Sequence, residues 1–300
     1  MVTYPAVIKE DTLIKVALVI TTYNWVPALK KCLDSVLLQS VIPNEIIIAD
    51  DGSTNETKNL INSYKELMQS KLIHSWQPDE GFRLSRSRNL AISKAESDYI
   101  IVIDGDIIMH PDFIKDHILN ASYGQFVSGR RVRLAPAYSE KLMNTDLMPS
   151  PFSRGIYRGR EQAFRIPFLS KLLSSVSEDT NRIHGCNMAF WRKDLIRVNG
   201  FNNEFVGWGA EDKEFCARLL ILGIKKKKLK FAAVAFHIYH DESSRALKLA
   251  NDIIYRKTID KGIPFCDTGI DEFISSINIS YQSCSLNDLK AAHLRKVKDN

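Results

Sequence analysis

The chain has 300 residues, of which 45% are hydrophobic and 25% charged, a composition typical of a globular protein with a sizeable core. This composition excludes fibrous, collagen-like and wholly disordered proteins. Lysine and arginine outnumber aspartate and glutamate by 41 to 35. The resulting net charge of +6 is too small and too dispersed to indicate a nucleic-acid partner.

The N-terminal part of the chain alternates β-rich runs with helical patterns. Buried strands are expected at 15–21, 45–50 and 99–103, with a weaker strand at 71–76. Helices are expected over 27–39, from 55 to about 70, and over 85–94. The alternation predicts an α/β fold, with a mostly parallel central sheet and helices on both faces. In such sheets, ligands bind at the carboxyl ends of the strands.

The rest of the chain divides less clearly. Residues 131–180 are basic and interrupted by proline and glycine, which predicts a loop-rich insertion and a candidate for a mobile loop that closes over a ligand. We expect a first half at 1–130, a second half of the same domain at 131–242, and a basic helical extension at 243–300.

Cysteine usage and the N-terminus indicate a cellular compartment. The five cysteines are odd in number and form no Cys-x-x-Cys pair, which favours reduced thiols over a disulfide framework. The N-terminus has no basic flank followed by an apolar run, and no apolar stretch approaches the length of a membrane helix. A cytoplasmic location is therefore expected.

Acidic residues close two of the expected strands. Asp50-Asp51-Gly52-Ser53 is compatible with simple turn chemistry, or with a carboxylate that accepts from a nucleobase. Asp104-Gly105-Asp106 could form a hairpin turn, or its two carboxylates could bind a divalent cation beside a diphosphate. In the second reading, Gly105 leaves room for a nucleotide.

Three further clusters could carry chemistry. Arg83, Arg86 and Arg88 at a helix start form either a solvated basic face or a phosphate site. In the run 207–212, with sequence GWGAED, the helix dipole explains the two acids but not a tryptophan between two glycines. His237 and His240 follow an apolar, strand-like run at 231–236, and could complete a metal site or be ordinary core and surface residues. 

Lys225–Lys228, together with Lys230, form a solvated face or a docking patch for anionic lipid.

Taken together, these motifs resemble a family-2 glycosyltransferase of the GT-A fold whose second half is similar to the β-1,4-galactosyltransferase C-terminal module. The first half matches at TTYN (21–24), ADDGS (49–53), GFRLSRSRN (81–89) and DGD (104–106). The second half matches at GCNMAFWRKDL (185–195) and NGFNNEFVGWGAED (199–212). Bacterial chondroitin-polymerase-type and surface-polysaccharide transferases combine the same two halves.

The resemblance implies a set of roles for the nucleotide end of the site. Thr21, Tyr23 and Asp51 would hold the uridine of a UDP-sugar donor. Arg88 would lie near the diphosphate, and Asp104 would contact the ribose or the metal.

It also implies roles for the metal and for the acceptor end. Asp106 would bind Mn²⁺ or Mg²⁺, and His237 and His240 would correspond to a metal-binding Met-x-x-His pair. Trp208 would cover the donor and acceptor sugars. Glu211 would bind acceptor hydroxyls, with Asp212 as the catalytic base of an inverting transfer.

The expected partners follow from the same resemblance. Ile183 is smaller than the aromatic residue that crowds out an N-acetyl group in the galactosyltransferases, which indicates that a UDP-N-acetylhexosamine is admitted as well as a UDP-hexose. The acceptor would be a glycan or a lipid-linked oligosaccharide in bacterial surface polysaccharide synthesis. Lys225–Lys228 and the basic residues His293, Arg295, Lys296 and Lys298 suggest peripheral contact with the inner face of the cytoplasmic membrane.

Two other functions remain open from the sequence. A nucleotidyltransferase would normally carry a glycine-rich basic loop where this chain has TTYNW at 21–25. A non-catalytic glycan- or sugar-nucleotide-binding module would not need Asp106 and Asp212. The enzymatic interpretation requires that the carboxylates at 104 and 106 and those at 211 and 212 lie around one ligand.

Overall fold

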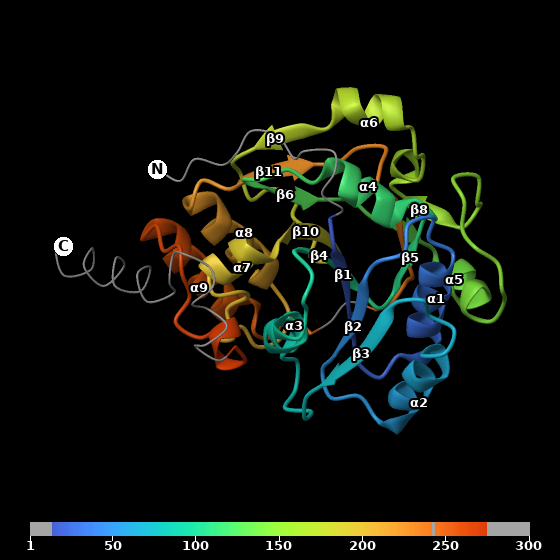
Figure 1. Cartoon of the computed structure of the whole chain (residues 1–300), viewed down its shortest axis with the longest axis horizontal. Helices are drawn as coiled ribbons and strands as arrows, with labels where there is room; N and C mark the ends of the chain where they lie inside the picture. The colour runs from blue at the N-terminus through green and yellow to red at the C-terminus, as the bar shows by residue number, and fades with distance from the viewer. Residues whose placement is uncertain (1–13, 242–243, 275–300) are drawn as a thin grey trace.

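A computed structural model describes residues 14–241 and 244–274, which form a central sheet with helices on both faces (Figure 1). The eight-stranded sheet has the order β3-β2-β1-β4-β10-β6-β11-β9. Its strands are β1 (Val16–Thr22), β2 (Glu45–Asp50), β3 (Lys71–Trp76), β4 (Tyr99–Asp104), β6 (Gln125–Ser128), β9 (Ser175–Ser177), β10 (Asn187–Trp191) and β11 (Lys225–Lys228). The four N-terminal strands are parallel to one another, and β11 is parallel to β6, whereas β10 and β9 run antiparallel to their neighbours. The expected mostly parallel sheet is confirmed.

A second, four-stranded sheet has the order β5-β12-β7-β8. Its strands are β5 (Ile107–Met109), β7 (Val132–Leu134), β8 (Ile156–Arg158) and β12 (Ala235–His237). Strand β5 begins three residues after β4 ends, so this small sheet stands beside the carboxyl end of β4.

Helices cover both faces because the central strands bury side chains in both directions. In β1, Leu18 and Ile20 belong to one hydrophobic cluster, and Ala17 and Val19 belong to another. Helices α1 and α2 pack in the first cluster, and α3, α7 and α8 in the second, as their opposite positions in Figure 1 show. The helices are α1 (Val26–Leu37), α2 (Asn55–Tyr64), α3 (Leu84–Ser93), α4 (Phe113–Asn120), α5 (Pro136–Met143), α6 (Pro167–Leu173), α7 (Arg192–Arg197), α8 (Glu211–Ile221) and α9 (Lys248–Asp260).

Three expectations about local structure were wrong. The helix after residue 54 ends at Tyr64 rather than near residue 70. The stretch 131–180 is not mainly loop, since it contains β7, α5, β8, α6 and β9, and both β7 and β8 lie in the small sheet. In the apolar run at 231–236 the strand begins only at Ala235, because Phe231 and Ala233 have φ of 55° and 48°, which no strand residue adopts.

The lysine run was also misinterpreted. Lys225–Lys228 form β11, which pairs with β6 on one side and β9 on the other. The Lys226 side chain is buried, and its Nζ donates to the backbone carbonyls of Asp179 and Asn181. Lys226 is therefore not part of a solvated face and is not available to a lipid surface, whereas Lys225 in the same strand is exposed.

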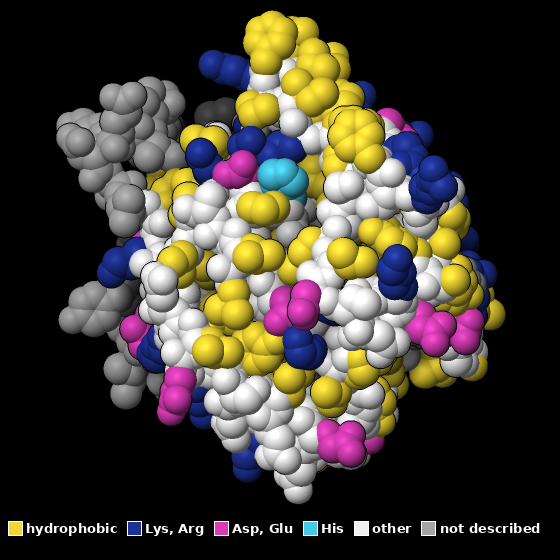
Figure 2. Space-filling model, turned by 90° about the vertical axis from the view of Figure 1, so that its right-hand side faces the viewer, with side chains coloured by type: hydrophobic (Ala, Val, Ile, Leu, Met, Phe, Trp, Pro, Cys, Tyr) yellow, Lys and Arg dark blue, Asp and Glu magenta, His cyan; other side chains and the backbone are white. Residues whose placement is uncertain are grey.

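Other parts of the surface are mixed in character. Figure 2 shows lysine and arginine side chains scattered among acidic and apolar ones, with apolar side chains prominent at the top of the view, at the height of α6 in Figure 1. In α6, Phe168 and Leu172 are strongly exposed. Within the described ranges, the helices include none that is long and apolar enough to cross a membrane.

The thiols and the C-terminal region follow the sequence expectations as far as they can be compared. Cys32, Cys186, Cys216 and Cys266 are free and buried, while Cys284 lies outside the described residues. Helix α9 agrees with a helical segment after residue 243. The basic residues at 293–298 also lie outside the described residues.

Candidate active site

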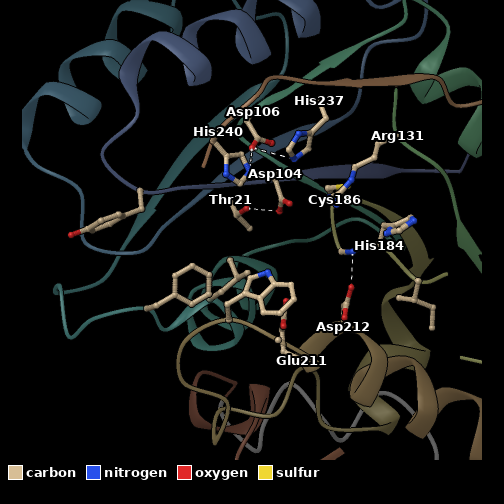
Figure 3. Close-up of a pocket in the computed structure, with 18 of the residues that line it drawn as sticks. Thr21, Asp104, Asp106, Arg131, His184, Cys186, Glu211, Asp212, His237 and His240 are labelled. Carbon is tan, nitrogen blue, oxygen red and sulfur yellow. Dashed lines mark hydrogen bonds and ion pairs between the residues drawn. The ribbon is translucent and has the colours of Figure 1, made fainter. Parts of the chain in front are cut away.

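A cleft of about 820 Å³ opens at the carboxyl ends of β1 and β4, where the parallel part of the sheet meets the small sheet. Thr21 near the end of β1 is in register with Asp104 at the end of β4, and its hydroxyl donates to Asp104 Oδ1 at 2.9 Å. Figure 3 shows this pair in the middle of the cleft, with Asp106 on one side and Glu211 and Asp212 on the other. The carboxyl ends of these strands therefore form the floor of the site, as the fold class predicts.

Asp51, directly after β2, marks one end of the cleft. Its Oδ1 accepts from Gln77 Nε2 at 2.6 Å and its Oδ2 from the backbone N–H of Arg83 at 2.8 Å. Burial raises the pKa of Asp51 to about 6, although these two hydrogen bonds oppose the rise. Tyr23 lies at the same end; its ring is half exposed, and its hydroxyl donates to Asp79 Oδ2 at 2.8 Å.

Asp106, His237 and His240 form a candidate metal site. Asp106 Oδ2 lies 3.5 Å from His237 Nε2 and 3.3 Å from His240 Nε2. One possible ligand atom from each of the three residues lies within 4.8 Å of the other two. The strands bring them together because His237 in β12 is in register with Ile107 in β5, the residue after Asp106. Asp104 does not belong to this group.

Two features of this group fit a divalent cation. Asp106 Oδ1 is buried and has no hydrogen-bond partner, which is costly for a carboxylate oxygen unless a cation binds it. Burial, with the nearby charge of Arg131, holds the pKa of His237 well below its ordinary value, so its imidazole is neutral and has a lone pair available. One carboxylate and two imidazoles suit transition-metal ions such as Mn²⁺.

Arg88 connects the two acidic parts of the cleft. Its side chain is 1% exposed, and its guanidinium lies 3.3 Å from Asp104 Oδ1 and 3.4 Å from Glu211 Oε1. These contacts join a residue at the end of β4 to the first residue of α8, 107 positions later in the chain. A buried arginine between two carboxylates fixes the spacing of the two elements.

Glu211 and Asp212 begin α8 and face the cleft. Asp212 Oδ2 accepts from the backbone N–H of Gly185 at 2.9 Å, and its Oδ1 accepts from that of Lys213 at 2.7 Å. Burial raises the pKa of both Glu211 and Asp212, and Arg88 opposes the rise. A carboxylate with a raised pKa is a better proton acceptor near neutral pH.

Trp208 is held over the mouth of the cleft by an unusual loop. Gly207, Gly209 and Ala210 all have positive φ, at 72°, 120° and 67°. Alanine adopts such a conformation at a cost, so the loop shape is imposed by its surroundings. The Trp208 side chain is 40% exposed, with Arg245 stacked 5.4 Å from the ring centroid. An indole in this position is free to contact a ligand.

The structure thus collects all of the sequence-predicted site residues in one cleft, and the required proximity of positions 104 and 106 to 211 and 212 is observed. The residues concerned are Thr21, Tyr23, Asp51, Arg88, Asp104, Asp106, Trp208, Glu211, Asp212, His237 and His240. The arginine cluster does not act as one face, because among its members the cleft is lined by Arg88 and not by Arg83 or Arg86. Arg86 instead donates to Gln77 Oε1.

Two lining residues were not singled out from the sequence. Arg131 lines the cleft and points toward Cys186, with its Nη1 3.5 Å from Cys186 Sγ (Figure 3). His184 lies beside it, where burial and neighbouring arginines lower its pKa to about 4. The basic run at 130–133 was a signal for Arg131, but it was interpreted as part of a loop.

Comparisons with known proteins agree with this geometry. The model of "Glycosyl transferase family 2" matches residues 17–196, and that of "N-terminal domain of galactosyltransferase" matches 173–241. The chain is 27% identical to validoxylamine A glucosyltransferase of Streptomyces hygroscopicus subsp. limoneus over 69% of its length, and 25% identical to Escherichia coli chondroitin synthase over 74%. It spans only 48% and 34% of these two relatives.

A structural comparison supports the same fold. The crystal structure of residues 1–349 of S. aureus TarS in complex with UDP superposes with a TM-score of 0.56 at 16% identity, covering 92% of this chain and 77% of that one. This likeness confirms the expected GT-A fold. The family-2 model matches more than half of the chain, over the strands and loops that form the cleft. The protein therefore belongs to glycosyl transferase family 2.

Proposed function

We propose that this protein is an inverting, metal-dependent glycosyltransferase that moves a hexose or N-acetylhexosamine from a UDP-sugar to a glycan acceptor. The observation that carries the proposal is the Arg88 bridge, because it holds the carboxylates at the end of β4 and at the start of α8 around one cleft. In this proposal the cleft would present nucleotide-binding, metal-binding and proton-accepting groups to one ligand.

The nucleotide would bind at the Asp51 end. The ionised carboxylate of Asp51 would accept a hydrogen bond from the N–H of the uracil ring. The Gln77 side chain and the backbone N–H of Arg83 hold that carboxylate in position. Tyr23 would line the base and Asp104 the ribose. The UDP complex of the structurally similar TarS supports a uridine nucleotide as the donor.

The chemical step would use Asp212 as the base. An acceptor hydroxyl loses its proton to Asp212 as its oxygen bonds to the anomeric carbon and the bond to the UDP oxygen breaks on the opposite face. One displacement of this kind converts an α-linked donor to a β-linked product. Glu211 and Trp208 would orient the acceptor, and the backbone N–H groups of Gly185 and Lys213 fix the base.

A divalent cation, Mn²⁺ or Mg²⁺, held by Asp106, His237 and His240 would supply electrostatic stabilisation of the departing diphosphate. Arg131 lies close enough to lower the pKa of His237, and its positive charge would add to that stabilisation.

The class of donor sugar and of acceptor is proposed from one cleft residue and from the relatives. Ile183 lines the cleft and is not aromatic, which favours admission of an N-acetyl group. The names of the relatives, chondroitin synthase among them, support a role in polysaccharide synthesis, with a free or lipid-linked glycan as the acceptor in the cytoplasm. Peripheral membrane contact remains part of this proposal, without Lys226.

The test is a UDP-release screen of UDP-glucose, UDP-galactose and their N-acetylated forms, each with Mn²⁺ and with chelator, and with glycan acceptors added. We expect release with at least one donor, dependence on the cation, and a β-linked product. Failure of UDP to bind would overturn the proposal, as would formation of a UDP-sugar with release of pyrophosphate from UTP and a sugar 1-phosphate, the signature of a nucleotidyltransferase. UDP binding with no transfer to any acceptor would indicate a binding module.

A further inference from the structure

A second cavity, of about 390 Å³, lies next to the catalytic cleft and shares Arg182 with it. Its volume falls in the range of about 300–1,000 Å³ that small-molecule sites occupy. None of the residues of the donor, metal or base sites lines it. It is thus a separate space that a ligand in the cleft can reach past Arg182.

The rim of this cavity is basic. Arg130, Arg182 and Lys230 line it, against a single carboxylate, that of Glu161. The Glu161 carboxylate already accepts from Gln162 Nε2 at 3.1 Å. Throughout residues 14–241 and 244–274, no carboxylate forms an ion pair with Arg130, Arg182 or Lys230, so these three cavity-lining residues bring positive charge without a protein counterion.

Part of the cavity lining is apolar and has an unusual backbone. Leu229, Phe231 and Ala233 line it, which gives a sugar ring a surface for its C–H face. Phe231 and Ala233 have positive φ, as does Arg182 at 56°. Backbone of this kind is strained and tends to occur at ligand sites.

The loop that carries Arg182 is rigidly held. The buried Lys226 Nζ donates to the Asn181 carbonyl at 2.8 Å and to Asp179 Oδ1 at 3.0 Å. Lys228 Nζ lies 3.1 Å from Asp179 Oδ2. These bonds hold the backbone next to Arg182, which lowers the entropy cost of ordering this loop around a ligand.

The position of the cavity relates it to the acceptor. Three residues after Arg182, Gly185 donates its backbone N–H to Asp212, the proposed base. Arg182 thus brings one edge of the cavity close in the chain to the residue that holds Asp212, where an acceptor hydroxyl would approach, and none of the cavity-lining residues belongs to the Asp51 end of the cleft. Arg133, which also lines the cleft and has no ion pair among the described residues, adds positive charge along this side.

We propose that this second cavity is an acceptor subsite that binds an anionic sugar, with a carboxylate or phosphate group paired to Arg182 and Lys230. The inference rests on the proposed glycosyl transfer and specifies its acceptor class as an anionic glycan that extends from Asp212 across Arg182 into the cavity. Arginine and lysine at a half-enclosed rim match such groups by charge-assisted hydrogen bonds.

The test is binding by calorimetry, so that it does not depend on turnover. The full chain, loaded with UDP and Mn²⁺, is titrated with an unsulfated glucuronate-containing tetrasaccharide, with the same tetrasaccharide after reduction of its carboxylates to alcohols, and with an oligo(ribitol phosphate). We expect one anionic probe to bind at least about tenfold tighter than the reduced one, the effect of a single charge-assisted hydrogen bond. The preferred anionic probe distinguishes carboxylate from phosphate.

Variants then locate the binding. Lys230→Glu and Arg182→Glu should each weaken the preferred anionic probe at least about tenfold and leave UDP affinity unchanged. Lys58→Glu, an equal charge change at an exposed site on α2, should leave both affinities unchanged. Equal binding of the anionic and reduced probes, no binding of either anionic probe, or full binding by Lys230→Glu would overturn the subsite. Loss of UDP binding in the unmodified protein would instead contradict the proposed function.

Discussion

The substitution Asp212→Asn tests the proposed base directly. The asparagine side chain keeps the size of the aspartate but cannot accept a proton at neutral pH. Loss of a positioned general base lowers the rate by about 10²–10⁴-fold, which corresponds to about 3–5 kcal/mol of transition-state stabilisation. UDP affinity should be unchanged, because Asp212 lies at the acceptor end of the cleft.

The structure also predicts the cost of this substitution in stability. Asp212 accepts from the backbone N–H groups of Gly185 and Lys213, and an asparagine offers one acceptor oxygen for the two donors. The asparagine oxygen can keep the part-buried N–H of Gly185 and leave the exposed N–H of Lys213 to bond water, so the cost is about 1 kcal/mol. Burial already penalises the charged carboxylate of Asp212, and its replacement by a neutral amide offsets part of this loss in the free energy of unfolding. The Tm should fall by a few degrees, without loss of folding.

The assay is UDP release with donor and acceptor, together with calorimetric titration of UDP and a thermal melt. Asp252→Asn is the matched control, since Asp252 also lines the cleft but has no part in the proposed chemistry. The control should retain its turnover. Turnover of Asp212→Asn within about tenfold of the unmodified protein would refute the assignment of the base.

Three further predictions concern the metal, the nucleotide and the fold. Asp106→Ala should abolish both Mn²⁺-dependent turnover and the rise in Tm on adding Mn²⁺; a Tm rise equal to that of the unmodified protein would contradict the metal site. Because burial raises the pKa of Asp51 to about 6, UDP affinity should fall about tenfold per pH unit as the pH drops below that value and the carboxylate becomes protonated. Titrations of Asp51→Asn at the same pH values should show a shallower profile, which keeps only the contribution of the UDP terminal phosphate with its pKa of about 6. An unchanged slope would exclude Asp51 as the titrating group. Lys226→Met should lower the free energy of unfolding by about 1–3 kcal/mol through loss of its hydrogen bonds, whereas Lys225→Met on the same strand, which breaks an exposed ion pair, should change it by less than about 1 kcal/mol; equal effects in denaturant melts would refute the buried role of Lys226.

The second half of the chain was harder to predict than the first for a physical reason. Strands β1, β2 and β4 are buried on both faces, so their sequences are continuous apolar runs that local patterning identifies within a residue or so. The stretch 131–180 consists of short elements whose stability comes from pairing with distant partners, as β7 pairs with β12 a hundred residues later. No local pattern reveals such pairing. The division of the chain near residue 130 stays a prediction. Strands β10 and β11, from the second half, lie in the same sheet as the strands of the first half.

The lysine run shows the same limit at the level of single residues. Four consecutive lysines carry no alternation of polar and apolar side chains, so the sequence cannot indicate a strand or which residue points inward. Inside the sheet, Lys226 is buried because the loop at 179–181 supplies oxygen atoms for its ammonium group. That compensation depends on residues 45 or more positions away.

The parallel core, the family motifs and the chemical types of the site residues could all be predicted from local sequence, because strand burial and turn formation depend on neighbouring residues. Which of those residues lie together depends on how the chain packs in three dimensions. Contacts between distant segments form the Arg88 bridge, the Asp106–His237–His240 group and the cavity beside Arg182. The separations in the chain run from 16 positions, between Arg88 and Asp104, to 134 positions, between Asp106 and His240. Contacts over such separations are fixed by how the sheets and helices pack, and no local pattern of residues encodes them.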